Sequence, residues 1–373
     1  MIYLDNNATT QVHPEVLDIV NYYLKEHWGN PNSSYSFGER EKNAIENART
    51  AVANLVNANS SEMIFTSCAT ESNNTAFFAA TQSAKNKKHV ITSAVEHSSV
   101  MSICKNLEKH GYKVTYLRVN EDGMLDINEL EDSISDDTCL ISIMWANNET
   151  GVLFPIREVS EICQRKKVLF HCDAVQAIGK IPIDLEEISI DYLSLSGHKI
   201  GAPKGIGALY IRKGVPFSTF MIGGGQESGY RGGTYNTAFI VGLGKASELT
   251  LSQINAYGQD VKILRDYFED KIVELIPSVY FNGKNSSRIP NTSNIGISGI
   301  DSDIIINYLS QFDIFISSGS ACSSQVIEPS HVIQAMKGYD KATEALRISL
   351  SLNATHNHID GLLENLKKCL ILA

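Results

Sequence analysis

The chain has 373 residues, of which 43% are hydrophobic and 20% are charged. These proportions are typical of globular proteins and the length suits two domains, so a disordered, collagen-like or fibrous protein is excluded. The net charge of −10 disfavours direct binding of nucleic acid, because phosphate contacts need clustered lysine and arginine.

Amphipathic helical patterns alternate with short, apolar, β-branched runs along most of the chain. This alternation predicts an α/β fold around a largely parallel sheet. The expected helices of this part cover residues 14–26, 37–57, 71–84, 99–110 and 156–166. The expected strands are short and buried, and they cover residues 63–66, 89–92, 113–119, 139–145, 168–172, 192–196 and 206–211.

A helical pattern without internal proline runs from residue 238 to residue 275, which suits a helix that connects two domains. After it, the pattern predicts a smaller α+β unit with apolar runs at 291–297, 314–317 and 346–351 and helices at 303–310 and 356–370. We therefore expect a large domain of residues 13–255, and a small domain formed by residues 1–12 and 256–373.

Seven cysteines occur in the chain, without a Cys-x-x-Cys pair: Cys68, Cys104, Cys139, Cys163, Cys172, Cys322 and Cys369. An odd set of this kind fits neither a disulfide framework nor a tetrahedral zinc site, so we expect reduced thiols, a cytoplasmic protein and no metal. No secretory signal follows Met1 and no apolar run reaches the length of a membrane span, so no membrane partner is expected.

Lys199 follows an expected strand, in Ser-Gly-His-Lys at 196–199, and a glycine-rich stretch comes next. Alone this is a weak signal, because most lysines are solvated surface charges. Asp173, however, lies at the end of the preceding strand. A carboxylate and an amine at neighbouring strand ends suit pyridoxal phosphate, whose ring nitrogen binds the carboxylate and whose aldehyde forms a Schiff base with the amine. Taken alone, Asp173 would also suit a helix N-cap.

Polar residues follow other expected strands. Thr70 lies where a helix begins, so that its hydroxyl and the N–H groups around it can bind a phosphate, although an ordinary helix cap is the alternative. His97 can lie flat on an aromatic cofactor or move a proton, although a structural histidine is the commoner case. The turn at 146–151 adds a polar cluster at the same end of the sheet.

Nine motifs occur in order along almost the whole chain, at residues 3–10, 29–33, 69–74, 96–97, 147–151, 173–176, 196–199, 317–322 and 346–349. With them the chain resembles the cysteine desulfurases of the NifS/IscS type, which are class V aminotransferase-like enzymes. The resemblance implies pyridoxal 5'-phosphate as cofactor and the fold type I of its transferases. In that fold a large domain has a mainly parallel seven-stranded sheet, and a smaller α+β domain follows it.

The resemblance also implies how the cofactor ring is held. Lys199 would be the Schiff-base lysine, Asp173 would bind the pyridine nitrogen, and Gln176 would donate a hydrogen bond to the phenolic oxygen. His97 would stack on the ring and act as acid and base toward the substrate. These expectations agree with the roles that the residue types suggest on their own.

Other residues would hold the phosphate and the substrate. The phosphate is expected to bind at Ala69, Thr70, Ser196 and His198. Thr234 would reach the phosphate of the other subunit in a homodimer. Asn148 and Arg347 would bind the substrate carboxylate, the arginine through a bidentate fork.

Cys322 differs from the other cysteines because residues 317–324 are small and polar and include Gly319, a composition that suits a loop with an exposed thiol. The implied reaction converts L-cysteine to L-alanine and leaves the sulfur on Cys322 as a persulfide. The chain departs from the family at Cys68, where glycine is common, and at Gly232, where serine is usual.

Several alternatives remain open at this point. A selenocysteine lyase shares the fold, another pyridoxal phosphate aminotransferase would need no catalytic thiol, and a scaffold that has lost its chemistry would lack the lysine, aspartate or cysteine. The sulfur acceptor is an unidentified protein. Iron–sulfur cluster assembly, tRNA thiolation and DNA phosphorothioation are all compatible with the sequence.

Overall fold

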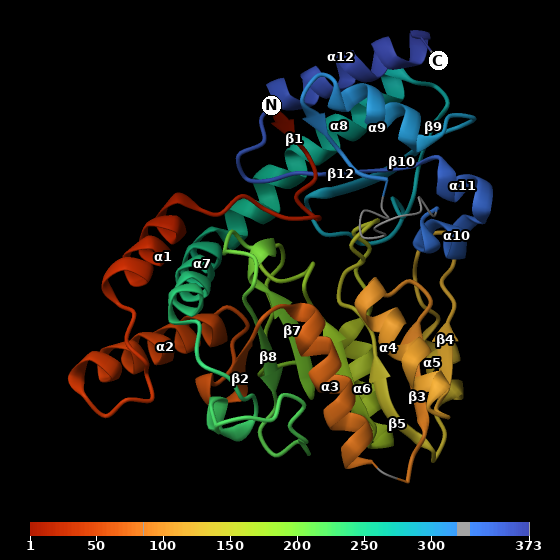
Figure 1. The fold of residues 1–373 in the computed structure, drawn as a ribbon. Coiled ribbons are helices and arrows are strands. Elements are labelled where there is room, and N and C mark those ends of the chain that lie inside the picture. Colours follow the sequence, from red (N-terminus) through yellow and green to blue (C-terminus); the bar gives the residue numbers. More distant parts are fainter. Residues whose placement is uncertain (85, 319–328, 373) are drawn as a thin grey trace.

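The computed structural model describes residues 1–84, 86–318 and 329–372, and its fold is shown in Figure 1. The largest sheet among these residues contains β2 (Met63–Thr66), β3 (His89–Ser93), β4 (Lys113–Leu117), β5 (Thr138–Ser142), β6 (Leu169–Asp173), β7 (Tyr192–Ser196) and β8 (Gly207–Ile211). Their order is β2-β8-β7-β6-β5-β3-β4, and within it β8 runs antiparallel to both neighbours. The predicted seven-stranded, mainly parallel α/β sheet is confirmed.

Helices cover both faces of this sheet. One face packs on α3 (Ala69–Ser83) and α4 (Ser98–Lys109). The other face belongs to an apolar cluster with α1 (Pro14–Glu26), α2 (Ser36–Asn54), α5 (Ile127–Ser133), α6 (Ile156–Lys166) and α7 (Thr237–Ala256). The alternation of side chains along β2 shows why both faces are apolar, since Met63 and Phe65 enter one cluster and Ile64 enters the other.

The long helix predicted at 238–275 is present, because α7 continues through a π-helical turn (Tyr257–Val261) into α8 (Lys262–Leu275). In Figure 1 it connects the large sheet to a smaller layer of α8, α9 (Ser302–Ser310) and α12 (His356–Leu372). This layer packs on a sheet of order β12-β10-β9, formed by Ala345–Ser349, Thr292–Ile297 and Val279–Phe281.

The N-terminal segment passes from the smaller layer to the large sheet. There β1 (Ile2–Tyr3) pairs with β11 (Ile314–Phe315), and further along the N–H of Thr10 donates to the carbonyl of His198 at 2.9 Å. The division of the chain into two domains stays a prediction. Two short helices that follow residue 330, α10 (His331–Lys337) and α11 (Tyr339–Thr343), bury their apolar side chains in the cluster of the large sheet.

The sequence pattern does not predict α5, α10, α11 and β9, because each has seven residues or fewer and shows too little periodicity. The strand expected at 139–145 ends earlier, at Ser142, although Ile143 and Trp145 still donate backbone hydrogen bonds to the strand beside it. In the described part of the chain, no helix is both long enough and apolar enough to cross a membrane.

Candidate active site

The carboxyl ends of β2, β3, β5, β6 and β7 lie along one edge of the large sheet, because these strands run in the same direction. Thr70, His97, Asn148, Asp173 and Lys199 follow or end these strands, so the fold brings the predicted residues to this edge. In open α/β sheets, ligands bind outside the carboxyl ends of the strands. The placement of these residues therefore agrees with a single cofactor site.

Asp173 and His97 are connected through two residues that the sequence analysis left without a role. Asn73 Nδ2 donates to Asp173 Oδ2 at 2.9 Å and to Ser99 Oγ at 3.0 Å, and Ser99 Oγ lies 2.9 Å from His97 Nδ1. Burial lowers the pKa of His97, and the nearby charge of Asp173 opposes this effect only in part. The imidazole is therefore neutral at pH 7 and can accept a proton.

Asp173 also caps the turn after β6, since its Oδ1 accepts a hydrogen bond from the N–H of Val175 at 3.1 Å. The capping role that the sequence left open for Asp173 is thus present, in addition to its proposed role as partner of the pyridine nitrogen. The carboxylate is buried, and its two oxygens retain lone pairs for a further donor. A protonated pyridine nitrogen is such a donor.

The first turn of α3 fits a phosphate group. Its N-cap residue, Cys68, makes no side-chain hydrogen bond to the helix, so the N–H groups at Ala69 and Thr70 keep their capacity for an anion. Thr70 is exposed beside them. A side chain at Gly207 would place its Cβ 3.0 Å from the Cα of Cys68, so glycine in β8 permits this close approach of the loop.

Two further residues predicted to bind phosphate come from the end of β7. Ser196 is its last residue, and a short 3₁₀ turn (Gly197–Lys199) carries His198 directly after it. His198 Nδ1 lies 3.1 Å from Thr9 Oγ1. Burial lowers the pKa of His198 to about 4, and the charge of Lys199 contributes to this, so the ring would hold a phosphate as a neutral hydrogen-bonding group.

Lys199 and Gln176 meet on one carbonyl oxygen of the N-terminal segment. Lys199 Nζ donates to the Asn7 carbonyl at 2.5 Å and to the Ala8 carbonyl at 2.8 Å. Gln176 Nε2 donates to the same Asn7 carbonyl at 2.9 Å. The aldehyde and the phenolic oxygen of pyridoxal phosphate are on adjacent ring atoms, so the closeness of these two side chains fits the roles expected of them.

Arg347 lies on β12 and is 2% exposed. Its Nη1 donates to the Asn148 carbonyl at 3.1 Å, and its Nη2 donates to Asp5 Oδ1 at 2.7 Å. Its Nε and the Oδ1 atom of Asn148 are buried without a hydrogen-bond partner among the described residues. Buried polar atoms are rarely left unpaired, so the Nε–H group of the arginine is available as a donor to a carboxylate. Sequence reasoning missed the pairing with Asp5.

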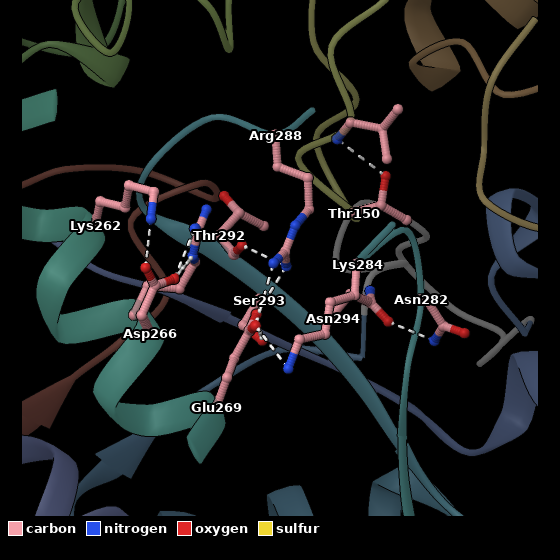
Figure 2. A network of polar contacts seen from close by, with 12 residues as sticks. Thr150, Lys262, Asp266, Glu269, Asn282, Lys284, Arg288, Thr292, Ser293 and Asn294 are labelled. Atoms are coloured by element: carbon pink, nitrogen blue, oxygen red, sulfur yellow. Dashed lines mark hydrogen bonds and ion pairs between the residues drawn. The ribbon is translucent and has the colours of Figure 1, made fainter. Parts of the chain in front are cut away.

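A buried ion pair fixes the strand that lies next to Arg347 (Figure 2). Arg288 Nη1 donates to Glu269 Oε1 at 2.8 Å, and Ser293 Oγ donates to the same oxygen at 2.8 Å. The neighbouring Thr292 accepts a hydrogen bond from Asn7 Nδ2 at 2.8 Å. The start of β10 is thereby connected to the N-terminal segment of the site.

Cys322 lies outside the described residues, so its predicted role is considered from the sequence alone. Described residues on each side of positions 319–328 contact the predicted substrate-binding residues or their neighbours. Ser317 and Arg347 exchange backbone hydrogen bonds of 3.2 and 2.6 Å, and Ser330 donates from its hydroxyl to the carboxylate of Glu149. Glu149 directly follows Asn148, so Ser317 and Ser330 are both next to the predicted substrate-binding residues.

Thr234 is exposed. Its loop is held to α3 by Arg231, whose Nε donates to Glu71 Oε1 at 2.8 Å. The departure from the family at Gly232 has a local explanation, because a Cβ there would lie 2.5 Å from the Cα of Gly223. The expected contact of Thr234 with a second subunit stays a prediction.

The six described cysteines are free thiols, and all except Cys68 are buried. Burial raises the pKa of Cys104 to about 12 and that of Cys139 to about 11, so these thiols are poor nucleophiles at neutral pH. Cys68 is half-buried, and its sulfur accepts a weak hydrogen bond from Ser67 Oγ at 3.7 Å. Within the described residues, no group of histidine, cysteine and carboxylate side chains could hold a metal ion.

The residues at the edge of the large sheet therefore fit pyridoxal phosphate: a lysine, a buried carboxylate and a helix start whose N–H groups can bind a phosphate. Arg347 of β12 adds an Nε–H group without a partner among the described residues. Comparison with known proteins agrees. The family model described as aminotransferase class-V matches residues 2–362.

Individual relatives cover nearly the whole chain. A cysteine desulfurase of Trichormus azollae is 48% identical over 98% of this chain and 91% of its own length. The cysteine desulfurase NifS of Azotobacter vinelandii is 44% identical over 96% of this chain and 90% of its own length. A solved NifS-like protein superposes with a TM-score of 0.94 at 36% identity, and the match covers 100% of both chains. The chain belongs to the class V aminotransferase family and, within it, to the cysteine desulfurases of the NifS/IscS type.

Proposed function

We propose that this chain is a pyridoxal phosphate enzyme that converts L-cysteine to L-alanine and transfers the sulfur to Cys322 as a persulfide. One observation carries the proposal: the Lys199 amine and the Asp173 carboxylate lie at one edge of the large sheet, and the partly unpaired guanidinium of Arg347, from β12, contacts Asn148 at the same edge. Pyridoxal phosphate and the substrate carboxylate can both be held there. The cysteine desulfurase relatives support the same reaction.

When bound, pyridoxal phosphate supplies an electron sink for the electrons released at the substrate Cα. Asp173 keeps the pyridine nitrogen protonated, because a carboxylate beside a cation favours the charged form. Lys199 would bind the aldehyde, and its amine, once displaced by the amine of the substrate, would remove the proton from Cα of cysteine. The Thr70, Ser196 and His198 side chains hold the phosphate.

The substrate is oriented by its carboxylate. Arg347 donates a fork of N–H groups to it, and the Asn148 side chain completes the contact. His97 is neutral at pH 7 and accepts the proton of the thiol that reacts. The sulfur then bonds to the Cys322 sulfur while its bond to the substrate Cβ breaks, so that one cysteine and one enzyme thiol become one alanine and one persulfide.

The proposal includes a homodimer, and exposed apolar side chains support it. Ile222 is 90% exposed and Trp28 is 76% exposed. The loop of Ile222 is near that of Thr234, since the N–H of Gly232 donates to the Met221 carbonyl at 2.8 Å. A second copy that covers this loop would place Thr234 of the partner subunit close to the phosphate, as the family resemblance implies.

We also propose that the enzyme works in the cytoplasm, where reducing conditions keep Cys322 a free thiol, and that a protein acceptor takes the persulfide sulfur. The acceptor is identified by loading the enzyme with radiolabelled cysteine, capturing the proteins that bind to it and finding which of them gains label. Transfer to a protein of iron–sulfur assembly, tRNA thiolation or DNA phosphorothioation would assign the pathway.

The main experiment uses purified enzyme with pyridoxal phosphate. The parent is expected to show a visible absorption band of the bound cofactor, and the Lys199→Ala variant is expected to lose it. The Cys322→Ala variant should keep the band but release no sulfide from cysteine in the presence of a thiol reductant. Cys104→Ala, which removes a buried thiol, is the matched control. Parent-rate sulfide release by Cys322→Ala would refute the persulfide role, and faster turnover of selenocysteine than of cysteine would reassign the enzyme as a lyase.

A further inference from the structure

A second lysine, Lys180, is buried beside the cofactor site and has no role in the chemistry described above. It is 3% exposed and lies in the turns after β6. Its Nζ donates to Asn7 Oδ1 at 3.0 Å and to Gln176 Oε1. No carboxylate among the described residues lies within ion-pair distance of it. Burial of an amine is costly, so a lysine in this place requires an explanation. An apolar side chain such as methionine or leucine could be buried here without that cost.

The surroundings of Lys180 favour a neutral amine. Burial lowers its pKa well below the usual value, and the positive charges of Lys199 and Arg347, which face it, lower it further. A neutral amine has two N–H groups, and Lys180 contacts two amide oxygens. The number of donors therefore matches the number of acceptors without a counter-ion.

The contacts with Asn7 and Lys180 set how the Gln176 amide is oriented. The oxygen and nitrogen of a glutamine amide are almost the same size, so the group can rotate by 180° unless its partners distinguish them. The Asn7 carbonyl can only accept, so Nε2 faces it, and Lys199 Nζ lies at the same oxygen. Oε1 then faces the Lys180 amine, which donates to it and holds the amide in this orientation. This directs the N–H groups of Gln176 toward the cofactor site.

Asn7 strengthens this arrangement because each of its polar groups has a partner. Its Oδ1 accepts from Lys180 and from Asn291 Nδ2, both at 3.0 Å, and its N–H donates to Ser349 Oγ at 2.9 Å. Lys180 thus connects Gln176, through Asn7, to Asn291 and Ser349 near the smaller sheet.

We propose that Lys180 is a positioning residue that fixes the Gln176 amide with its N–H groups toward the cofactor, and so stabilises negative charge on the phenolic oxygen. The inference rests on the proposed role of Gln176. Loss of a proton from the bound cofactor leaves more charge on that oxygen. Without the aligned N–H group the proton is held more tightly, and the pH midpoint of the visible absorption band rises.

The test is a pH titration of that band in the holoenzyme and four variants. Lys180→Met and Gln176→Ala are each expected to raise the midpoint by about one pH unit, a roughly tenfold change that corresponds to one lost hydrogen bond. The double variant should show no further rise, because both changes act through one N–H group. Lys105→Met, on the exposed face of α4, should leave the midpoint unchanged.

The outcomes separate the two proposals. A shift in Gln176→Ala without a shift in Lys180→Met overturns the role of Lys180 and leaves that of Gln176 intact. A double variant that equals the sum of the single shifts also overturns it, because Lys180 would then act independently. No shift in either variant overturns both roles. Thermal melting establishes that each variant is folded, and Lys180→Leu replaces the methionine variant if that one does not melt cooperatively.

Discussion

Arg347 offers the sharpest test of substrate binding, and the informative change is Arg347→Lys. The arginine is buried, and its described hydrogen bonds go to the Asn148 carbonyl and to Asp5. Three of its five N–H groups therefore have no partner among the described residues, and two of them can form a fork to a carboxylate. Lysine keeps the positive charge opposite Asp5, so the variant removes the fork without leaving that carboxylate unpaired.

The size of the effect follows from the hydrogen bonds that are lost. A hydrogen bond to a charged group contributes about 1.5 to 3 kcal/mol, and each 1.4 kcal/mol corresponds to a factor of ten in affinity. Lysine can still make one contact with the carboxylate but not two. We therefore expect KM for cysteine to rise about 10-fold to 100-fold, with a smaller change in kcat, because the carboxylate is bound equally in the ground state and the transition state.

The assay is steady-state alanine formation from cysteine, with saturating pyridoxal phosphate and a thiol reductant. The matched control is Arg288→Lys, which changes another arginine with a buried side chain, one that pairs with Glu269 (Figure 2). It should keep the parent KM. If KM in Arg347→Lys stays within threefold of the parent value while both variants are folded, Arg347 does not bind the substrate carboxylate.

Three further predictions concern pH and stability. His97 has a lowered pKa, so kcat/KM should fall on the acid side with a midpoint below pH 6.5, and this limb should be absent from the residual activity of His97→Ala. Burial raises the pKa of Glu96 to about 8, well above its value of 4.5 in the unfolded chain, so the stability from this group is complete below pH 4.5 and is lost as the pH rises to 8. Urea unfolding should show this loss in the parent, and an equal loss in Glu96→Gln would contradict the assignment. Glu227 forms a buried ion pair with Arg49 at 2.6 Å, and Glu227→Leu should cost about 3 to 5 kcal/mol in urea unfolding, because the guanidinium is left without its buried partner. The double variant with Arg49→Met should recover much of that stability, and failure to do so would mean that the pair is not the cause.

The α/β architecture and most of the regular elements were predictable from the sequence. Apolar runs such as Met63–Thr66 and Tyr192–Ser196 match the observed strands, because fully buried strands have a strong local signal. The short elements were not predictable, since a helix such as α11 has too few residues for a periodic pattern. Its place depends on packing against the large apolar cluster.

The residue types of the candidate site were also readable from the sequence. A lysine and an aspartate at successive strand ends suggest one cofactor class, because parallel strands expose their carboxyl ends at one edge. The motif around Cys322 indicated a thiol set apart from the buried cysteines. Its geometry lies outside the described residues, so this part of the proposal still depends on the sequence.

Only the tertiary structure showed which residues support that chemistry. Asn73 connects Asp173 to Ser99, Asp5 pairs with Arg347, and Lys180 donates to the Gln176 amide oxygen. Asp5 and Arg347 are 342 positions apart in the sequence. A sequence pattern reports the local environment of each residue, whereas a hydrogen bond between distant segments depends on how the whole chain packs. The sequence determined the kind of chemistry, and the packing decided how its groups are oriented.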